Sequence, residues 1–202
     1  TIVETEDGLF YRYGNELRPV EVKEITVPYR TDDGLAERSF TTYRTHHGPI
    51  VRGEGDRWVA VALMEEPLKA LIQSYTRTKA ANLDEYLAIM EAHTNSSNNT
   101  LFADASGNIA YLHSNFVPVR DASLDYRFPV DGSDPSTDWR GVHTLEESPN
   151  SINPPNGWVQ NTNNWPYSAA GEYSPKRGDV FRGLLQRASI GLNGVVPLLS
   201  PD

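Results

Sequence analysis

The sequence predicts an α+β fold with antiparallel sheets, and the order of its local patterns carries that prediction. Strand-like patterns fill the first third of the chain, two helical patterns follow between residues 67 and 90, and a hairpin pattern covers residues 99–113. Strands that are grouped apart from helices are typical of α+β proteins. With 202 residues, 38% of them hydrophobic, the chain is long enough for one domain or slightly more and too apolar for a disordered chain.

The strand prediction for the first third rests on the alternation of apolar and polar side chains. Residues 20–27 place valine and isoleucine in a broken alternation, and residues 39–44 continue the pattern. Asp32-Asp33-Gly34 lies between these stretches and is a turn signal. The run from Trp58 to Met64 is short and nearly all apolar, which predicts a strand buried on both faces.

Two helices are predicted next, because the apolar spacing changes to the helical period. One begins after Pro67, and the other begins at Asn82, a helix-capping residue with Glu85 three positions later as its capping-box partner. Each has an apolar stripe that we expect to pack into the core. The stripes are Leu68, Leu71, Ile72 and Tyr75 in the first helix, and Leu83, Tyr86, Leu87 and Met90 in the second.

The rest of the chain reads as a hairpin, a long loop region and two short elements. Residues 99–113 predict two strands around a Gly107-Asn108 turn. Residues 119–157 are rich in Asp, Ser, Pro and Asn, and a loop of that length is usually functional or disordered. A short strand is expected at residues 158–160 and a helix at about 177–188.

Composition excludes several classes of function. The net charge is −9 and the densest cationic stretch is two residues long, so nucleic acid is not an expected partner. The longest apolar run, residues 58–64, is too short to span a bilayer, so no membrane partner is expected either. The chain has no cysteine, which removes disulfides, thiolate metal sites and cysteine nucleophiles. No signal peptide is visible at Thr1, so either export is absent or the N-terminus has been removed.

Four segments occur in an order that points to one family. They are His47–Val51, Asn99–Tyr111, Trp139–Gly141 and Asn153–Asn164. Together they resemble the large (β) chain of penicillin acylase-family amidohydrolases, a group that includes acyl-homoserine lactone acylases. The resemblance covers roughly residues 25–164, and the N-terminal serine nucleophile of that family is not visible here.

The resemblance implies both a parent fold and a parent reaction. The whole chain, residues 1–202, would be part of the β chain in a four-layer αββα sandwich of the N-terminal-nucleophile hydrolases. The parent would mature by autocatalytic cleavage and hydrolyse the amide bond of an N-acylated small molecule, and this fragment alone would be inactive. Its partners would be that substrate, the α chain and the remainder of the β chain. No organic or redox cofactor is implied, a structural calcium is possible in the parent, and the location would be periplasmic or secreted.

Asn99 is the leading candidate for a catalytic residue. Acyl transfer builds negative charge on the carbonyl oxygen, and a preoriented amide N–H stabilises that charge. In the resembled family an asparagine five residues before the aspartate of an Ala-Asp pair has this role, and Asn99 precedes Asp104 by that interval. The neighbouring Asn98 leaves the register open by one residue. The alternative is that Asn99 only satisfies a backbone group at a turn.

Other motif residues receive structural or orienting roles. Arg120 matches an arginine that orients the asparagine or the substrate in relatives, and its alternatives are a solvated position or an ion pair with Asp121. His47, Gly48 and Pro49 resemble a structural turn, so neither His46 nor His47 is expected to be a catalytic base. Asp104, Gly107 and Asn108 are expected to hold the hairpin turn. Asn161 and Asn163-Asn164 are expected to fix backbone around the long loop.

The sequence allows three further interpretations. Thr1 could be an N-terminal nucleophile, but Ile2–Tyr11 resembles a strand well inside the β chain, which favours a boundary set by proteolysis or expression. Asp131–Asp134 resembles part of a calcium loop without its closing glutamate, so the metal ligands stay unassigned. The rival function is a non-catalytic β-rich domain that binds carbohydrate or peptide. It predicts an exposed groove lined by Trp139, Trp158 and Trp165, whereas the acylase interpretation predicts that these are mostly buried and that Asn99 faces a cleft.

Overall fold

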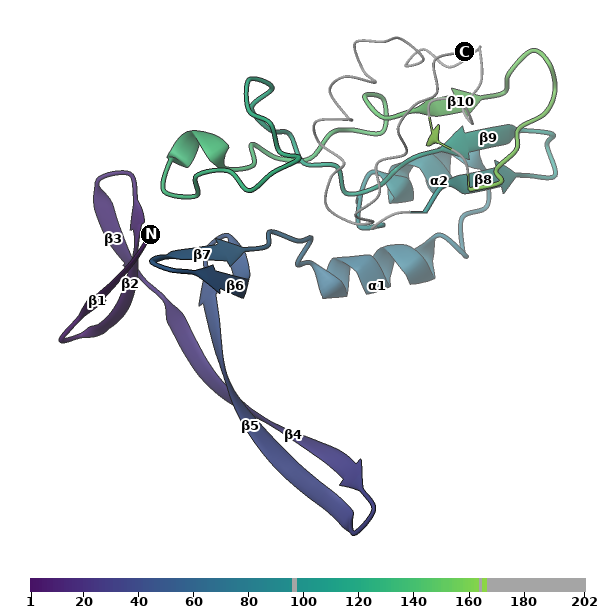
Figure 1. The fold of residues 1–202 in the computed structure, drawn as a ribbon. Coiled ribbons are helices and arrows are strands. Elements are labelled where there is room, and N and C mark those ends of the chain that lie inside the picture. The colour runs from purple at the N-terminus through teal and green to yellow at the C-terminus, as the bar shows by residue number, and fades with distance from the viewer. Residues whose placement is uncertain (96–97, 164, 167–202) are drawn as a thin grey trace. The chain divides into compact units, whose positions relative to one another are not determined.

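The computed structural model describes residues 1–95, 98–163 and 165–166, which fall into two compact units (Figure 1). Unit 1 consists of Thr1–Leu63 and Pro129–Asp138, and unit 2 consists of the described parts of Met64–Phe128 and Trp139–Asp202. The helix predicted at 177–188 lies outside the described residues. No helix in the described part of the chain is long and apolar enough to cross a membrane.

Unit 1 is built almost entirely of antiparallel strands. One sheet has the order β1-β2-β3 and the other the order β4-β5-β6-β7, and all their pairs are antiparallel. The bounds are Ile2–Thr5 for β1, Gly8–Tyr13 for β2, Glu16–Pro19 for β3, Glu21–Thr31 for β4, Gly34–Thr45 for β5, Gly48–Glu54 for β6 and Arg57–Ala60 for β7. The strands predicted at residues 20–27 and 39–44 are therefore confirmed.

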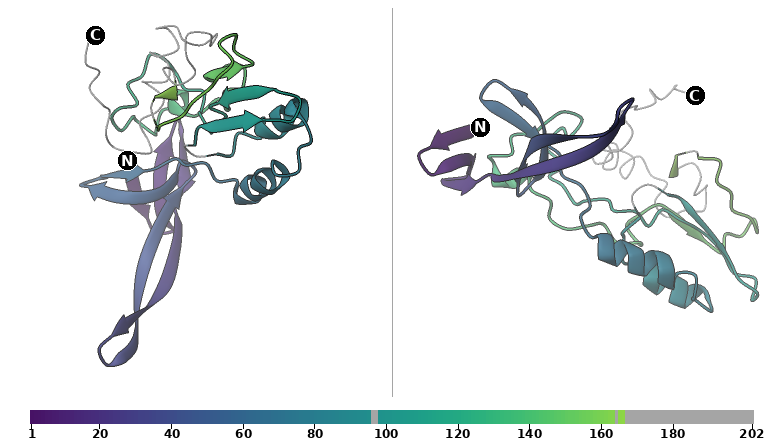
Figure 2. Two further views of the ribbon diagram at one scale, coloured as in Figure 1. Left: turned by 90° about the vertical axis from the view of Figure 1, so that its right-hand side faces the viewer. Right: turned by 90° about the horizontal axis from the view of Figure 1, so that it is seen from below.

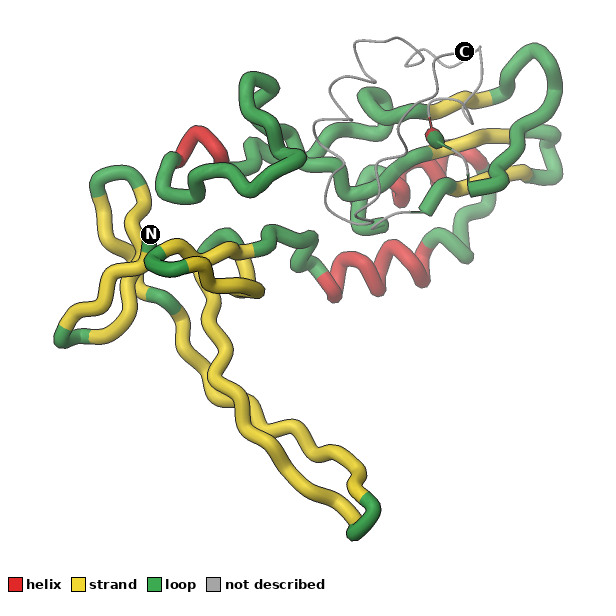
Figure 3. Tube along the Cα trace, viewed as in Figure 1, coloured by secondary structure: helices red, strands yellow, loops and turns green. Residues whose placement is uncertain are grey.

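The hairpin of β4 and β5 is the longest element of unit 1. Its ladder runs from the Glu21–Arg44 pair to the Thr31–Gly34 pair, and Figure 3 shows it as an extended pair of strands. The turn requires φ +128° at Gly34, a backbone conformation that side chains disfavour. Every residue of β4 is exposed, so this hairpin is held by its ladder and not by a core.

The predicted buried strand at 58–64 is wrong in its extent and in its burial. The strand is β7, which ends at Ala60, and Leu63 beyond it is 45% exposed. β7 lies at the edge of its sheet and pairs with β6 alone. Arg57 is exposed and the other three residues of β7 are only partly buried, so the apolar run overstated the burial of this strand.

Unit 2 combines two helices with a small antiparallel sheet. The helices are α1 (Pro67–Thr76) and α2 (Leu83–Met90), and the sheet has the order β10-β9-β8. The strands are β8 (Thr100–Ala103), β9 (Ile109–Leu112) and β10 (Asn150–Ile152). α2 packs on the sheet (Figure 2), and the buried cluster between them is Leu83, Tyr86, Met90, Ala110, Leu112 and Leu145.

Helix α2 begins as its sequence predicts. The Asn82 side-chain oxygen accepts the backbone N–H of Glu85 at 2.9 Å, and the Glu85 carboxylate accepts the backbone N–H of Ala81 at 2.8 Å. These two bonds satisfy N–H groups that a helix start leaves without partners. The apolar stripe of α2 faces the core as expected, with Met90 fully buried.

Helix α1 forms where predicted, but the expectation that its apolar stripe is buried is wrong. Leu68, Leu71, Ile72 and Tyr75 are all more than half exposed. The buried residue of α1 is Gln73, whose amide nitrogen donates to the Met90 carbonyl at 3.4 Å and whose amide oxygen accepts the Thr94 N–H at 3.0 Å. The hydrogen bonds of Gln73 with backbone groups at the C-terminal end of α2 therefore determine which face of α1 is buried.

The third strand of the small sheet differs from the prediction. The strand expected at 158–160 is wrong, because those residues adopt no regular structure and residues 150–152 form β10 instead. β10 pairs with β9 through Asn150–Leu112, Ser151–Tyr111 and Ile152–Ala110. Polar residues dominate this strand, so an apolar pattern could not have found it. Otherwise residues 119–157 hold one short 3₁₀ turn, Pro135–Thr137 (η1), and are irregular as predicted.

Candidate functional site

Asn99 lies at the open end of the β8–β9 hairpin, directly opposite His113. The ladder ends with the Thr100–Leu112 pair, so the next position on each strand brings Asn99 and His113 together. Their side chains are in contact, with His113 Nδ1 2.8 Å from Asn99 Oδ1. The turn that sets this register is held by Asp104, which accepts the backbone N–H groups of Ser106 and Asn108 at 2.9 and 3.0 Å.

The hydrogen bonds around Asn99 fix which way its amide points. The backbone N–H of Asn163 donates to Asn161 Oδ1 at 3.1 Å, which identifies that atom as an oxygen. The Asn99 atom 3.2 Å from the same oxygen must then be the donor Nδ2. Asn99 Oδ1 consequently faces His113, and since an amide oxygen only accepts, His113 Nδ1 carries the proton.

His113 is therefore a neutral ring with a defined tautomer. Burial lowers the pKa of His113 to about 4, so the imidazole is uncharged at neutral pH. Its Nε2 bears the lone pair, and Asn115 Nδ2 lies 3.3 Å away as a donor. Asn115 Nδ2 also lies 3.1 Å from Nδ1, but that nitrogen already carries the proton and cannot accept. The hydrogen bond from His113 Nδ1 to Asn99 Oδ1 is therefore the contact that fixes the tautomer of the ring.

This arrangement makes Asn99 a preoriented amide donor. Its oxygen accepts from His113 and one N–H donates to Asn161, so both ends of the amide plane are held. A donor held in this way needs no reorganisation when negative charge develops nearby.

The hairpin turn is built as the motif residues predict. Gly107 has φ +87°, and its N–H donates to the Asp104 carbonyl at 3.1 Å. Asn108 Nδ2 donates to Asp104 Oδ2 at 2.8 Å. The side-chain hydrogen bond from Asn108, followed by the backbone N–H groups of Asn108 and Ser106, holds the pKa of the Asp104 carboxyl below its usual range. Asp104 thus closes the turn that positions Asn99.

Arg120 occupies an aromatic setting. Its guanidinium lies 5.0 Å from the ring centre of Tyr126 and 5.4 Å from that of Trp139, and burial lowers its pKa. The neighbouring Asp121 accepts from Arg140, with Oδ2 3.0 Å from Arg140 Nη2. An orienting role of Arg120 toward Asn99 stays a prediction.

The His-Gly-Pro element lies in unit 1 and is tightly constrained. Gly48 has φ +129°, and a side chain there would place Cβ 2.1 Å from the Val61 carbonyl oxygen, so only glycine fits. The Pro49 carbonyl accepts the Val61 N–H at 3.0 Å, which ties β6 to the chain after β7. His47 Nε2 lies 2.7 Å from the Gly132 carbonyl oxygen. The structural role expected of this turn is consistent with these contacts.

In the loop that resembles a calcium site, the carboxylates accept hydrogen bonds from nearby residues of the same loop. Asp131 Oδ1 accepts from the backbone N–H and the hydroxyl of Ser133, and Asp134 Oδ1 accepts the backbone N–H of Ser136. Among the described residues, the group of metal-type side chains that converges contains two imidazoles, which are not the oxygen ligands that calcium prefers.

Comparison with known proteins gives the family. The penicillin amidase family model matches residues 1–194. The chain belongs to the penicillin amidase family. It is 33% identical over 163 residues to penicillin G acylase from Escherichia coli, covering 78% of this chain and 18% of that protein. It is 30% identical over 163 residues to penicillin acylase 2 proenzyme from Pseudomonas sp. (strain SE83), covering 79% and 20%.

A solved structure of the same kind has the same fold. It is a thermostable penicillin G acylase from Alcaligenes faecalis, which superposes with a TM-score of 0.66 at 30% identity over 78% of this chain and 28% of that one. The antiparallel α+β architecture of a penicillin acylase fragment is thus confirmed. The chain spans about a fifth of the length of its two sequence relatives.

Within this penicillin amidase chain, the tryptophans do not form the groove that a binding domain requires. Trp158 is 59% exposed, whereas Trp139 and Trp165 are partly buried. The rival prediction of three exposed tryptophans in one groove is therefore wrong, and the acylase prediction that they are mostly buried is wrong for Trp158. Asn99 is itself partly buried.

Sequence reasoning missed His113, Asn115 and the contact between Asn161 and Asn99. The signal for His113 was present, because a hairpin predicted over residues 99–113 pairs its own two ends. No local pattern predicts that Asn161 reaches Asn99, since these residues are joined only by the tertiary fold. Asn164 lies outside the described residues.

Proposed function

We propose that the parent enzyme of this chain hydrolyses the amide bond of an N-acylated small molecule. A serine at the N-terminus of the mature β chain, outside the residues present here, attacks the amide carbonyl with its own α-amino group as the base. The C–N bond breaks, the amine leaves with a proton and an acyl-enzyme remains. Water then attacks the ester, which releases the carboxylic acid and regenerates the serine.

Asn99 would stabilise the oxyanion in both steps. The observation that supports this role is the fixed orientation of its amide, held by His113 on the oxygen side and by Asn161 on the nitrogen side. A second donor, a backbone N–H outside this chain, would complete the oxyanion hole. Each such donor is typically worth about 10²–10³ in kcat.

The substrate class follows only in part from the relatives. Two of them are named as penicillin acylases, which favours an acylated amine as the substrate. Penicillins, acyl-homoserine lactones and lipopeptides are all N-acylated molecules of this type. Autocatalytic processing, pairing with an α chain, a periplasmic or secreted location and a structural calcium in the parent belong to the same proposal.

The first test is Asn99→Ala in the full-length enzyme, with steady-state kinetics on a chromogenic N-acyl amide. We expect kcat to fall by about 10²–10³ with a small change in KM, because the lost N–H acts mainly in the transition state. Asn156→Ala, at an exposed turn position, is the matched control and should leave kcat unchanged. A loss in Asn99→Ala of less than about tenfold would sink the oxyanion role.

Variants of His113 test whether the orientation of Asn99 matters. Asparagine can place an amide N–H close to the Nδ1 position, so His113→Asn should keep kcat within about threefold, whereas His113→Leu should lose at least about tenfold. In an Asn99→Ala background, His113→Leu should cause no further loss of kcat, because the imidazole acts through Asn99. Equal losses in both backgrounds would contradict this positioning role.

Intact-mass measurement of the expressed full-length protein tests the nucleophile. Two chains, the larger beginning at a serine upstream of Thr1, would support self-processing. A single uncleaved active species would remove the N-terminal serine from the mechanism.

A further inference from the structure

Three side chains in unit 1 form a cluster that the acyl-transfer chemistry does not use. His46 and His47 lie in the turn between β5 and β6, and Asp138 follows η1. One nitrogen of each imidazole and one carboxylate oxygen lie within 4.8 Å of one another. Within the described residues, they are the convergent group of metal-type ligands.

The His47 nitrogen that points away from Asp138, Nε2, is hydrogen-bonded to a backbone carbonyl. His47 Nε2 lies 2.7 Å from the Gly132 carbonyl oxygen, and since a carbonyl only accepts, Nε2 carries the proton of the neutral ring. The remaining nitrogen, Nδ1, then bears a lone pair. Gly132 permits this approach, because a Cβ there would lie 2.9 Å from Nε2.

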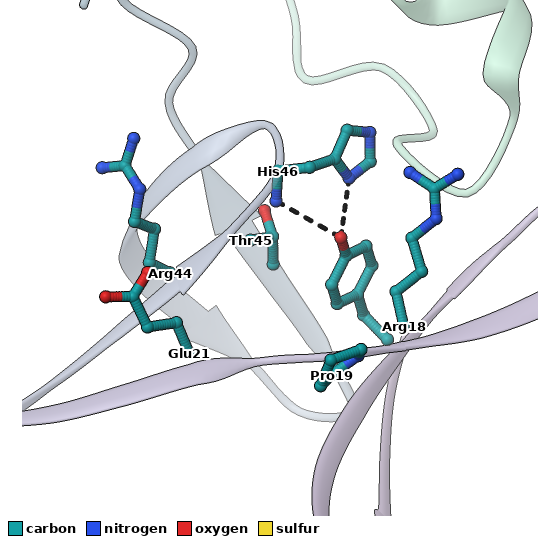
Figure 4. Close-up of a pocket in the computed structure, with 7 residues that line it drawn as sticks. Arg18, Pro19, Glu21, Arg44, Thr45 and His46 are labelled. Atoms are coloured by element: carbon teal, nitrogen blue, oxygen red, sulfur yellow. Dashed lines mark hydrogen bonds between the residues drawn. The ribbon is translucent and has the colours of Figure 1, made fainter.

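Tyrosines hold the outer atoms of the other two side chains. The Tyr11 hydroxyl lies 2.8 Å from His46 Nδ1 and accepts the His46 backbone N–H at 3.3 Å, and Figure 4 shows both bonds. The Tyr13 hydroxyl donates to Asp138 Oδ2. Ligating histidines in metal sites typically have their second nitrogen held in this way by a carbonyl or another polar group.

The three inner atoms face one another at a distance that suits metal coordination. Asp138 Oδ1 lies 3.5 Å from His46 Nε2 and 3.6 Å from His47 Nδ1, which is longer than a good hydrogen bond. Ligand bonds of about 2.0–2.1 Å at tetrahedral angles place ligand atoms about 3.3–3.4 Å apart. The two edges at Asp138 Oδ1 therefore match a small four-coordinate cation after a slight contraction, and the edge between the two imidazole nitrogens lies within 4.8 Å.

We propose that His46 Nε2, His47 Nδ1 and Asp138 Oδ1 bind one divalent transition-metal ion of the zinc class. Two imidazoles and one carboxylate suit Zn²⁺, whereas Ca²⁺ and Mg²⁺ prefer oxygen ligands throughout. With Nε2 donating to Gly132, His47 Nδ1 is the nitrogen that faces the Asp138 carboxylate, so a cation between them is bound by both atoms. The ion ties the β5–β6 turn to the segment after η1, and water completes its coordination.

The test uses the full-length protein after treatment with a chelator, with Zn²⁺ and Co²⁺ as probes. Equilibrium dialysis should show one saturable Zn²⁺ per chain at this site, and Co²⁺ should give the visible absorption of a four-coordinate ion. Glutamine can place its amide near Nε2, so His47→Gln keeps a donor for Gly132 while it removes the ligand. Both His47→Gln and Asp138→Asn should weaken Zn²⁺ binding by at least about tenfold.

Two controls separate a built site from incidental binding. His143, which pairs with Glu147 at 3.2 Å in unit 2, offers a histidine and a carboxylate outside the cluster, and His143→Gln should leave the binding unchanged. Tyr11→Phe keeps the aromatic ring and should weaken binding about tenfold through loss of the hydroxyl that holds His46. The same zinc affinity in wild type, His47→Gln and Asp138→Asn, or no saturable binding at all, would overturn the proposal and leave the cluster as a proton-bridged ion pair.

Discussion

The two main hairpins of this chain share one kind of ladder and differ in what covers them. In the β4–β5 hairpin all 11 residues of β4 are exposed, including Val22, Ile25 and Val27. In the β8–β9 hairpin each strand has only 4 residues, yet Ala110, Tyr111 and Leu112 are fully buried. A backbone hydrogen bond contributes about 1 kcal/mol net, whereas burial of a large apolar side chain contributes about 1.5–3 kcal/mol.

The comparison shows that the shorter hairpin is the one held by a buried core, which suits the catalytic role proposed for Asn99. Its buried strand fixes the position of Asn99 and His113 at the open end, where the ladder stops. The longer hairpin exposes apolar side chains on its surface. Because the chain spans about a fifth of its relatives, we expect the rest of the parent to cover that surface.

The largest expected difference between the two hairpins is in the free energy of unfolding, because only the short hairpin packs on a core. Met90 is fully buried under β9, so Met90→Ala should lower the free energy of unfolding by about 2–5 kcal/mol. Ile25→Ala on the exposed hairpin should cost less than about 1 kcal/mol, because it leaves no internal cavity. Urea unfolding of the 202-residue chain measures both. Equal losses would mean that β4–β5 has a core of its own.

A pH effect of intermediate size should belong to the short hairpin alone, because β4 and β5 contain no histidine. The pKa of His113 is about 4 in the folded chain and 6.5 ordinarily, so between these values only the unfolded chain takes up the proton. The neutral His113 ring therefore contributes its full share of the free energy of unfolding above pH 6.5. This contribution decreases below pH 6.5 and is lost as the pH falls through 4. The loss is at most about 3 kcal/mol, and smaller because the ring is partly solvated.

Thermal unfolding of wild type and His113→Asn across this pH range measures the contribution. The variant should show a smaller decrease in Tm between pH 6.5 and 4 than the wild type. Identical pH dependence in the two proteins would mean that His113 is not buried as a neutral ring.

The smallest effect concerns single side-chain hydrogen bonds in the two regions. Asn82→Ala removes the cap of α2, which packs on the short hairpin, and should cost about 1 kcal/mol. Thr26→Ala removes an exposed contact with Ser39 at 2.9 Å in the long hairpin and should cost less than about 0.5 kcal/mol. Chemical denaturation of the paired variants compares them directly. A larger loss for Thr26→Ala would reverse the ranking of the two regions.

Local chemistry explains which parts of the fold were predictable from the sequence. The cap at Asn82, the turn at Gly107 and the alternation along β4 and β5 are each encoded within a few residues, and the structure confirms these elements. The exposed face of α1 was not predictable, because helical spacing shows that a stripe exists and not whether the present chain covers it. β10 was missed because pairing with β9, rather than its own polar sequence, makes it a strand.

The candidate site likewise contains residues that the sequence could predict and contacts that it could not. Asn99 was found from the resemblance of its motif, and the turn residues around Asp104 follow from their own side-chain chemistry. The contacts of Asn99 with Asn161 and of His47 with Gly132 join segments distant in sequence. Only the tertiary fold brings such partners together, so no spacing rule within one segment could have predicted them.

The hydrogen bonds that His113 and Asn161 make with the Asn99 amide have a consequence for how such enzymes diversify. His113 and Asn161, which contact the Asn99 side chain, belong to unit 2, and they hold the amide without any contribution from an acyl group. Under the function proposed above, segments elsewhere in the parent that contact the acyl chain could change in length and polarity while the oxyanion donor keeps its orientation. New substrates would then become accessible through changes in those segments alone, with no change at Asn99.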